Sequence, residues 1–243
     1  MKFNKLANAA LAVFLLATTA YAGQELVRGN LAEPATLDAT LGEGVPGSNI
    51  MRDLYETLMS EDGEGNLVPG QAESYTISAD KTVYTFKIRD NANWSNGEPV
   101  TAQDFEYSFK RGVDPKTAAR YSWYFKILGI KNGADILAWT KPVDSLGVKA
   151  LDAKTLQITL GQPIPYFLIG ISHVTTAPVP QKTIEKYGKK WTNPANIVTN
   201  GPYKLSEWVV NEKIVLVKND NYYAKDSVKI DKVTFLPIPE QST

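Results

Sequence analysis

The chain has 243 residues, 43% of them hydrophobic and 21% charged, a composition typical of a folded globular protein and not of a disordered one. Lys plus Arg and Asp plus Glu both number 26, so there is no basic field to attract nucleic acid, and we expect no RNA or DNA partner. The length allows one large core or two modest domains.

The first 22 residues have the pattern of a secretory signal peptide. Lys2 and Lys5 form the charged start, residues 6–19 are apolar or small, and Ala20-Tyr-Ala22 is a small-x-small cleavage site. The apolar run is shorter than the roughly 20 residues that span a bilayer, so we expect cleavage rather than anchoring and no integral membrane segment afterwards. Because the sequence has no cysteine, we expect a free periplasmic protein, not a lipoprotein, with a mature net charge of about −2 and no disulfide.

The segment after the leader predicts a strand, a turn region and a helix in that order. Residues 24–30 are expected to form the strand, with Leu26 as its main apolar anchor. The turn region, 33–47, holds two prolines and three glycines. Ser48 is then a suitable N-cap for the helix. Its buried stripe would consist of Ile50, Leu54 and Leu58.

The next segment predicts a strand followed by a well-marked helix. Apolar and polar residues alternate from Thr82 to Ile88, as in a half-buried strand. Thr101 and Asp104 have the spacing of a capping box, which predicts a helix beginning there. Gly112 is expected to end that helix, and a second short helix is expected near Pro115.

The C-terminal half predicts further strands separated by short helices. We expect a strand at 155–160, an apolar helical or extended stretch at 166–171, a helix at 183–187, and strands at 203–209, 214–218 and 232–236. Strands and helices are mixed without strict βαβ alternation. The sequence therefore predicts a mixed α/β (α+β) fold.

Patterns for catalysis, cofactors and metals are absent from the sequence. The one histidine, His173, lies in an apolar stretch, where a hydrogen-bonded structural residue is the favoured interpretation over a base or a metal ligand. No nucleophile elbow, phosphate-binding loop or dinucleotide fingerprint occurs. The pair Glu61-Asp62 lies in a glycine-rich polar loop, where solvated carboxylates are favoured over a hydrolytic dyad. We expect no enzyme activity, no cofactor and no metal.

Two features fit binding of an extended ligand. Glu43, Gly44 and Val45 form a segment that another chain can approach closely because Gly44 has no side chain, and a peptide is expected to pair with its main chain. A tight surface turn is the alternative for this segment. Tyr121, Trp123 and Tyr124 form a dense aromatic patch, a composition that suits a ligand cleft and a core equally well.

Longer motifs then resemble a known family. They are Trp94-Ser-Asn-Gly-Glu-Pro-Val-Thr101 with the following Ala102-Gln-Asp-Phe-Glu-Tyr-Ser-Phe-Lys-Arg111, and Asn196-Ile-Val-Thr-Asn-Gly-Pro-Tyr-Lys-Leu205 with Trp208-Val-Val-Asn-Glu212. They resemble the extracytoplasmic solute-binding family of ABC importers, which includes oligopeptide- and dipeptide-binding proteins, over residues 24–239. The resemblance implies a periplasmic-binding-protein-like fold. It also implies that Glu43, Gly44 and Val45 pair with a peptide backbone and that Tyr121 borders the peptide, although Arg120 replaces an expected proline.

The resemblance also implies a domain organisation and partners. Residues 24–55 and 181–243 would form a hinge-side lobe, residues 56–180 a smaller inserted domain, and the second lobe would be missing. Expected partners are oligopeptides and inner-membrane permease subunits, with the protein a monomer and peptide binding weak because half a cleft leaves the ligand wet. The alternatives are a stand-alone interaction domain, a non-functional truncated product, or a related solute such as a dipeptide, a murein peptide or a nickel complex.

Overall fold

A computed structural model describes residues 23–239; the predicted signal peptide, 1–22, and residues 240–243 lie outside the described part of the chain. The strands are β1 (Glu25–Gly29), β2 (Met59–Glu61), β3 (Leu67–Pro69), β4 (Ala72–Ile77), β5 (Val83–Ile88), β6 (Val148–Ala150), β7 (Thr155–Thr159), β8 (Tyr203–Val209), β9 (Lys213–Lys218) and β10 (Lys232–Leu236). The α-helices are α1 (Gly44–Leu54), α2 (Ala102–Val113), α3 (Ser122–Ile127), α4 (Gly133–Leu137), α5 (Phe167–Gly170) and α6 (Gln181–Tyr187). Short 3-10 helices cover Val143–Ser145, Val174–Thr176, Gly188–Lys190 and Lys225–Ser227.

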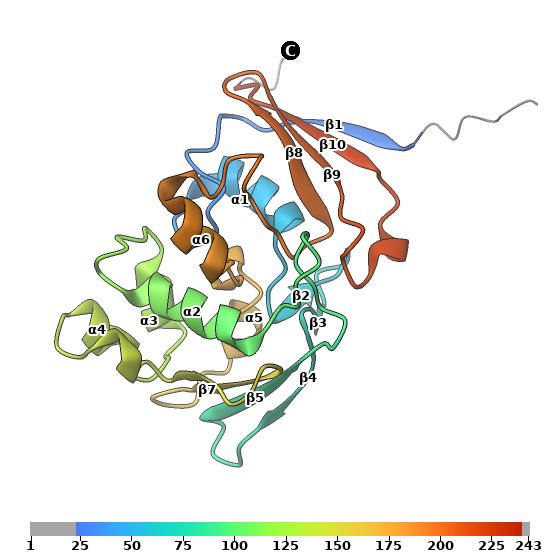
Figure 1. Cartoon of the computed structure of the whole chain (residues 1–243). Coiled ribbons are helices and arrows are strands. Elements are labelled where there is room, and N and C mark those ends of the chain that lie inside the picture. Colours follow the sequence, from blue (N-terminus) through green and yellow to red (C-terminus); the bar gives the residue numbers. More distant parts are fainter. Residues whose placement is uncertain (1–22, 240–243) are drawn as a thin grey trace, which may run out of the picture.

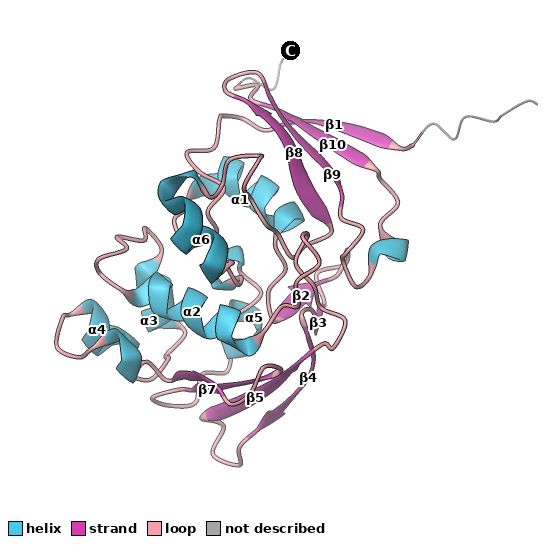
Figure 2. Cartoon of the chain, in the orientation of Figure 1, coloured by secondary structure: helices cyan, strands magenta, loops and turns pink. Residues whose placement is uncertain are grey.

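Two four-stranded sheets form opposite ends of the molecule, with α1, α2, α5 and α6 between them (Figures 1 and 2). One sheet has the order β1-β10-β9-β8, in which β1 is parallel to β10 and the other neighbours are antiparallel. The other sheet, β4-β5-β7-β6, is antiparallel throughout. β2 and β3 form a separate two-stranded hairpin.

The buried apolar side chains form two clusters. One cluster is built from residues between Leu58 and Ile171 and joins α2 to the β4–β7 sheet. The other combines residues from Leu37 to Tyr55 with residues from Val174 to Phe235, and joins α1 to the β8–β10 sheet. Two cores in one chain follow from the amphipathic faces of α1 and α2, each of which covers a different sheet. The division into lobes at 55/56 and 180/181 stays a prediction.

The strongest local signals in the sequence correspond to observed elements. β5 alternates between buried and half-buried side chains, as its period of two predicts. At α2 the capping box is formed: the Thr101 hydroxyl accepts from the Asp104 N–H, and Asp104 Oδ2 accepts from the Thr101 N–H at 2.8 Å. β8 and β10 have the bounds expected from the sequence.

Several boundaries were predicted wrongly. α1 begins at Gly44 and not after Ser48, and it ends at Leu54, so Leu58 is buried outside the helix. Leu26 is 38% exposed and does not anchor β1, because β1 is an edge strand. Gly112 lies inside α2, which runs to Val113. The segment from Pro115 forms turns, and the next helix is α3, which begins at Ser122.

No helix among residues 23–239 combines the length and the apolar character that a membrane crossing requires.

Candidate functional site

The N-terminus of α1 presents an exposed stretch of backbone. Glu43 is extended, with φ −142° and ψ 158°, and its side chain does not cap the helix. Gly44 has φ +76°, a left-handed conformation that favours glycine. The first N–H groups of any helix have no carbonyl partner within it. Residues 43–45 are all exposed, so an extended ligand can reach the N–H of Gly44, which makes only a long 3.5 Å hydrogen bond to the Tyr121 hydroxyl, and the N–H of Val45.

The buried side chain of Asn30 holds the start of α1 in place by hydrogen bonds. The side-chain amide of Asn30, which follows β1, donates to the Pro46 carbonyl at 3.0 Å. Asn49 on α1 in turn donates to Asn30 Oδ1 at 3.1 Å. Since Asn30 is only 2% exposed, these bonds are shielded from water and hold the helix start against the end of β1.

Tyr121, predicted from sequence as a ligand contact, lies beside this helix start. Its hydroxyl oxygen is 3.5 Å from the Gly44 nitrogen, and the Gly44 N–H points toward it. The structure therefore brings together residues that are 77 positions apart. Glu43 forms a long ion pair with Arg120, 3.7 Å between Oε1 and Nε. The Glu43 side chain is half exposed, so its carboxylate is accessible to a ligand beside Tyr121.

The aromatic patch continues from Tyr121 to the histidine. The Tyr121 ring meets Trp123 and His173 edge to face, with ring centroids 5.7 Å apart in both pairs. His173 also packs on Tyr124 at 4.9 Å. Val45 and Trp123 are about half exposed, so this surface offers apolar area next to the exposed backbone N–H groups of Gly44 and Val45.

His173 is the site residue whose position sequence reasoning missed. Its Nδ1 accepts from the Thr175 N–H at 3.2 Å, so the predicted hydrogen-bonded role is confirmed. Burial lowers the pKa of its imidazole, and the charge of Arg52 acts in the same direction, so the ring is neutral at pH 7. The only signal in the sequence was a lone polar residue in an apolar stretch, and the sequence spacing did not show that Tyr121 and Tyr124 would pack on it.

A cavity of about 230 Å³ is lined by Ser172 and Val174, the two chain neighbours of His173. Its walls include Arg52, Tyr55, Glu56, Glu61, Ser172 and Tyr222. The Glu56 carboxylate accepts from the hydroxyls of Tyr222 and Tyr223, at 2.6 and 3.1 Å, and from the side-chain amide of Gln71 at 2.7 Å. Burial raises the pKa of Glu56, while these hydrogen bonds oppose the increase.

The chemistry of the site is that of hydrogen bonding and packing. The Ser172 hydroxyl, on the cavity wall, lies 2.8 Å from Glu61 Oε1 and 2.7 Å from the Ile169 carbonyl oxygen, and its single proton can be donated to either acceptor. Within the described residues, no group of three or more His, Cys, Asp or Glu side chains is arranged to hold a metal ion. What the site offers a ligand is backbone donors, aromatic faces and a few charges.

The sequence also matches a family model. Residues 66–243 match the family 5 (middle) model of bacterial extracellular solute-binding proteins. The chain belongs to this family. One relative is the periplasmic oligopeptide-binding protein OppA of Salmonella typhimurium. It is 50% identical over 220 residues, which are 90% of this chain and 40% of that protein. The periplasmic murein peptide-binding protein MppA of Escherichia coli is 44% identical over 219 residues, again 90% of this chain and 40% of the relative.

Solved structures agree with the family assignment. Haemophilus influenzae OppA in complex with the peptide RPPGFSPFR superposes with a TM-score of 0.88 at 41% identity, over 90% of this chain and 42% of that one. The predicted family and mixed α/β, periplasmic-binding-protein-like fold are thereby confirmed. The chain spans about 40% of the length of the curated relatives it matches.

Proposed function

We propose that this chain carries one face of a peptide-binding site in the periplasmic component of an ABC importer. The observation that carries the proposal is the pair of exposed backbone donors, Gly44 and Val45, beside the Tyr121 hydroxyl. The names of relatives, which bind oligopeptides and murein peptides, support the same ligand class. On this proposal residues 1–22 direct export, inner-membrane permease subunits are partners, and the chain is a monomer that binds without catalysing a reaction.

Main-chain recognition follows from the chemistry of this face. Carbonyl oxygens of an extended peptide would accept from the Gly44 and Val45 N–H groups, whatever the peptide's sequence. Since Gly44 is left-handed and Val45 is helical, Glu43 alone has the extended conformation of a strand. The pairing would therefore be a short contact of two or so hydrogen bonds and not a long ladder.

Neighbouring side chains would contribute less specific contacts. The rings of Tyr121 and His173 offer a surface against which a peptide side chain can pack. Glu43 would attract an ammonium or amide group of the ligand, in competition with Arg120. The exposure of that ion pair makes it weak, and a ligand cation can displace Arg120.

The expected affinity of this chain alone is low. Each hydrogen bond contributes about 1 kcal/mol net, whereas association costs at least about 4 kcal/mol in lost translational and rotational freedom. Two hydrogen bonds and one aromatic contact, together about 3 kcal/mol, do not exceed that cost. We therefore expect a dissociation constant in the millimolar range or weaker.

Equilibrium titration tests the proposal. The chain from residue 23 onward is titrated with Ala-Ala-Ala, Lys-Lys-Lys and Ala-Glu-Ala while tryptophan fluorescence is followed, since Trp123 packs on Tyr121. The expected result is saturable binding of all three peptides, with affinities within about tenfold of one another because main-chain contacts dominate. Free alanine is the matched control and is expected not to saturate.

Two outcomes would overturn parts of this proposal. Absence of binding at 20 mM of every peptide would remove the proposed peptide class for this chain. Nanomolar affinity would contradict the expectation of weak binding. A dipeptide and a murein tripeptide, titrated in parallel, distinguish the related solutes.

A further inference from the structure

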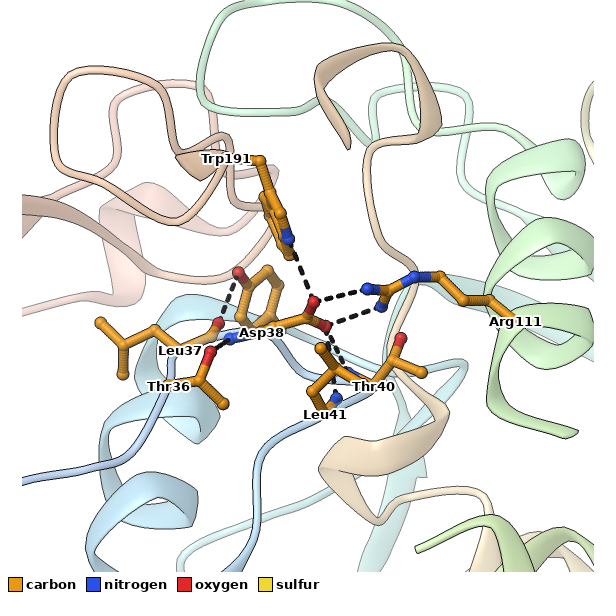
Figure 3. A network of polar contacts seen from close by, with 8 residues as sticks. Thr36, Leu37, Asp38, Thr40, Leu41, Arg111 and Trp191 are labelled. Atoms are coloured by element: carbon orange, nitrogen blue, oxygen red, sulfur yellow. Dashed lines mark hydrogen bonds and ion pairs between the residues drawn. The ribbon is translucent and has the colours of Figure 1, made fainter. Parts of the chain in front are cut away.

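A buried carboxylate closes the turn that leads into the helix start. Asp38 Oδ1 accepts from the N–H groups of Thr40 and Leu41 at 3.0 and 3.3 Å (Figure 3). The Asp38 carbonyl oxygen accepts from the N–H groups of Leu41 and Gly42 at 3.0 and 2.7 Å. The path of residues 38–42, directly before Glu43, is therefore set by one residue whose side chain is 3% exposed.

The same carboxylate is held by two side chains from distant parts of the chain. Arg111 of α2 donates from both terminal nitrogens, to Oδ1 at 2.8 Å and to Oδ2 at 2.6 Å. Trp191 Nε1 donates to Oδ2 at 3.0 Å (Figure 3). A bidentate pair between charged groups fixes both distance and orientation. Burial works against the charge of Arg111, but Asp38 outweighs it and the pKa of the guanidinium is raised.

Arg111 belongs to the element that leads to Tyr121. The next residue on α2, Gly112, lies directly against the Phe125 ring of α3, so that α2 and α3 are in close contact. Tyr121 is the residue immediately before α3. Displacement of Arg111 relative to Asp38 would thus change the position of Tyr121 relative to Gly44.

We propose that Asp38 and Arg111 are positioning residues for peptide recognition: their buried ion pair sets the separation between the backbone donors of Gly44 and Val45 and the hydroxyl of Tyr121. This inference rests on the proposed function, because it assigns a role to the same site. Neither residue touches the ligand. They act on the distance between the start of α1 and the start of α3, two segments that pack in different hydrophobic clusters.

Hydrogen exchange and binding in matched variants test the inference. Asp38→Asn removes the charge but keeps the size. Asp144→Asn is its control, since the exposed Asp144 pairs at 2.9 Å with Lys110, the neighbour of Arg111 on α2. In Asp38→Asn we expect amide exchange in residues 41–46 to be at least about tenfold faster and peptide affinity to fall about tenfold. In Asp144→Asn we expect both quantities to change less than about twofold.

A second variant keeps the test decisive if Asp38→Asn does not fold. Arg111→Lys retains the positive charge but loses the two-pronged contact, and it is expected to shift the Gly44 amide resonance and accelerate exchange at 41–46 by a smaller factor. Unchanged exchange and an unchanged Gly44 resonance in a folded variant of either residue would overturn the inference. These readouts need no peptide, so a failure of wild-type binding would count against the proposed function alone.

Discussion

Asp53 on α1 is expected to destabilise the protein at neutral pH. Burial raises the pKa of its carboxyl to about 6 from 3.8, with Arg28 opposing the increase. A raised carboxyl pKa means that the folded state binds the proton more tightly than the unfolded state does. The contribution of Asp53 to the free energy of unfolding is therefore most favourable below pH 3.8 and is lost as the pH rises through about 6.

Asp53→Asn should accordingly raise the free energy of unfolding by about 1 to 3 kcal/mol at pH 7.5 and by clearly less at pH 4.5. Urea denaturation at the two pH values measures this. An equal effect at both values, or a loss of stability at pH 7.5, would show that the charge of Asp53 is well accommodated in the fold.

Single residues also show where sequence information ends. That His173 would be hydrogen-bonded was predictable, because a lone imidazole in an apolar stretch needs a partner. Its place against Tyr121 and Tyr124 was not, since those residues come from a segment about 50 positions earlier in the chain. Glu43, Gly44, Val45 and Tyr121 remain predictions as ligand contacts, although the structure brings Tyr121 beside Gly44.

At the scale of elements, the contact between α2 and α3 depends on a missing side chain. A Cβ at Gly112 would overlap the ring of Phe125, which is 1% exposed. Gly112→Ala is expected to lower the free energy of unfolding by about 1 to 3 kcal/mol, because overpacking outweighs the better helix propensity of alanine.

The control for this variant is Gly63→Ala, at a position where a Cβ meets no atom within 4 Å. Thermal or urea denaturation compares the two. A gain in stability for Gly112→Ala would mean that Phe125 can turn aside and that propensity decides the outcome.

Elements with a clear period or cap were predictable, and strands without alternation or of only three residues were not. β5 and α2 carry an alternating pattern and a capping box, so their positions follow from local sequence. β4 has one buried residue followed by five exposed ones, a pattern without alternation, and β6 has only three residues. The early start of α1 was missed because a positive φ at Gly44 replaces the usual side-chain cap.

For the whole molecule, the family and the mixed α/β fold were predictable because long motifs carry them. The ion pair between Asp38 and Arg111, which joins the two segments of the site, was not predictable. Asp38 and Arg111 are 73 positions apart, and neither lies in a pattern that predicts a partner. An ion pair between residues of two cores depends on how the cores pack together, so it can be identified only from the three-dimensional structure.

The most direct test of main-chain recognition is to observe the two proposed donors themselves. In a ¹⁵N–¹H titration of the chain with Ala-Ala-Ala, the Gly44 and Val45 amide resonances are expected to move downfield and saturate together, as they would on donating to peptide carbonyls. Tyr121→Phe serves as the matched variant and should preserve these shifts with somewhat weaker binding. Saturable binding that leaves both amides unmoved while resonances elsewhere shift would contradict the account.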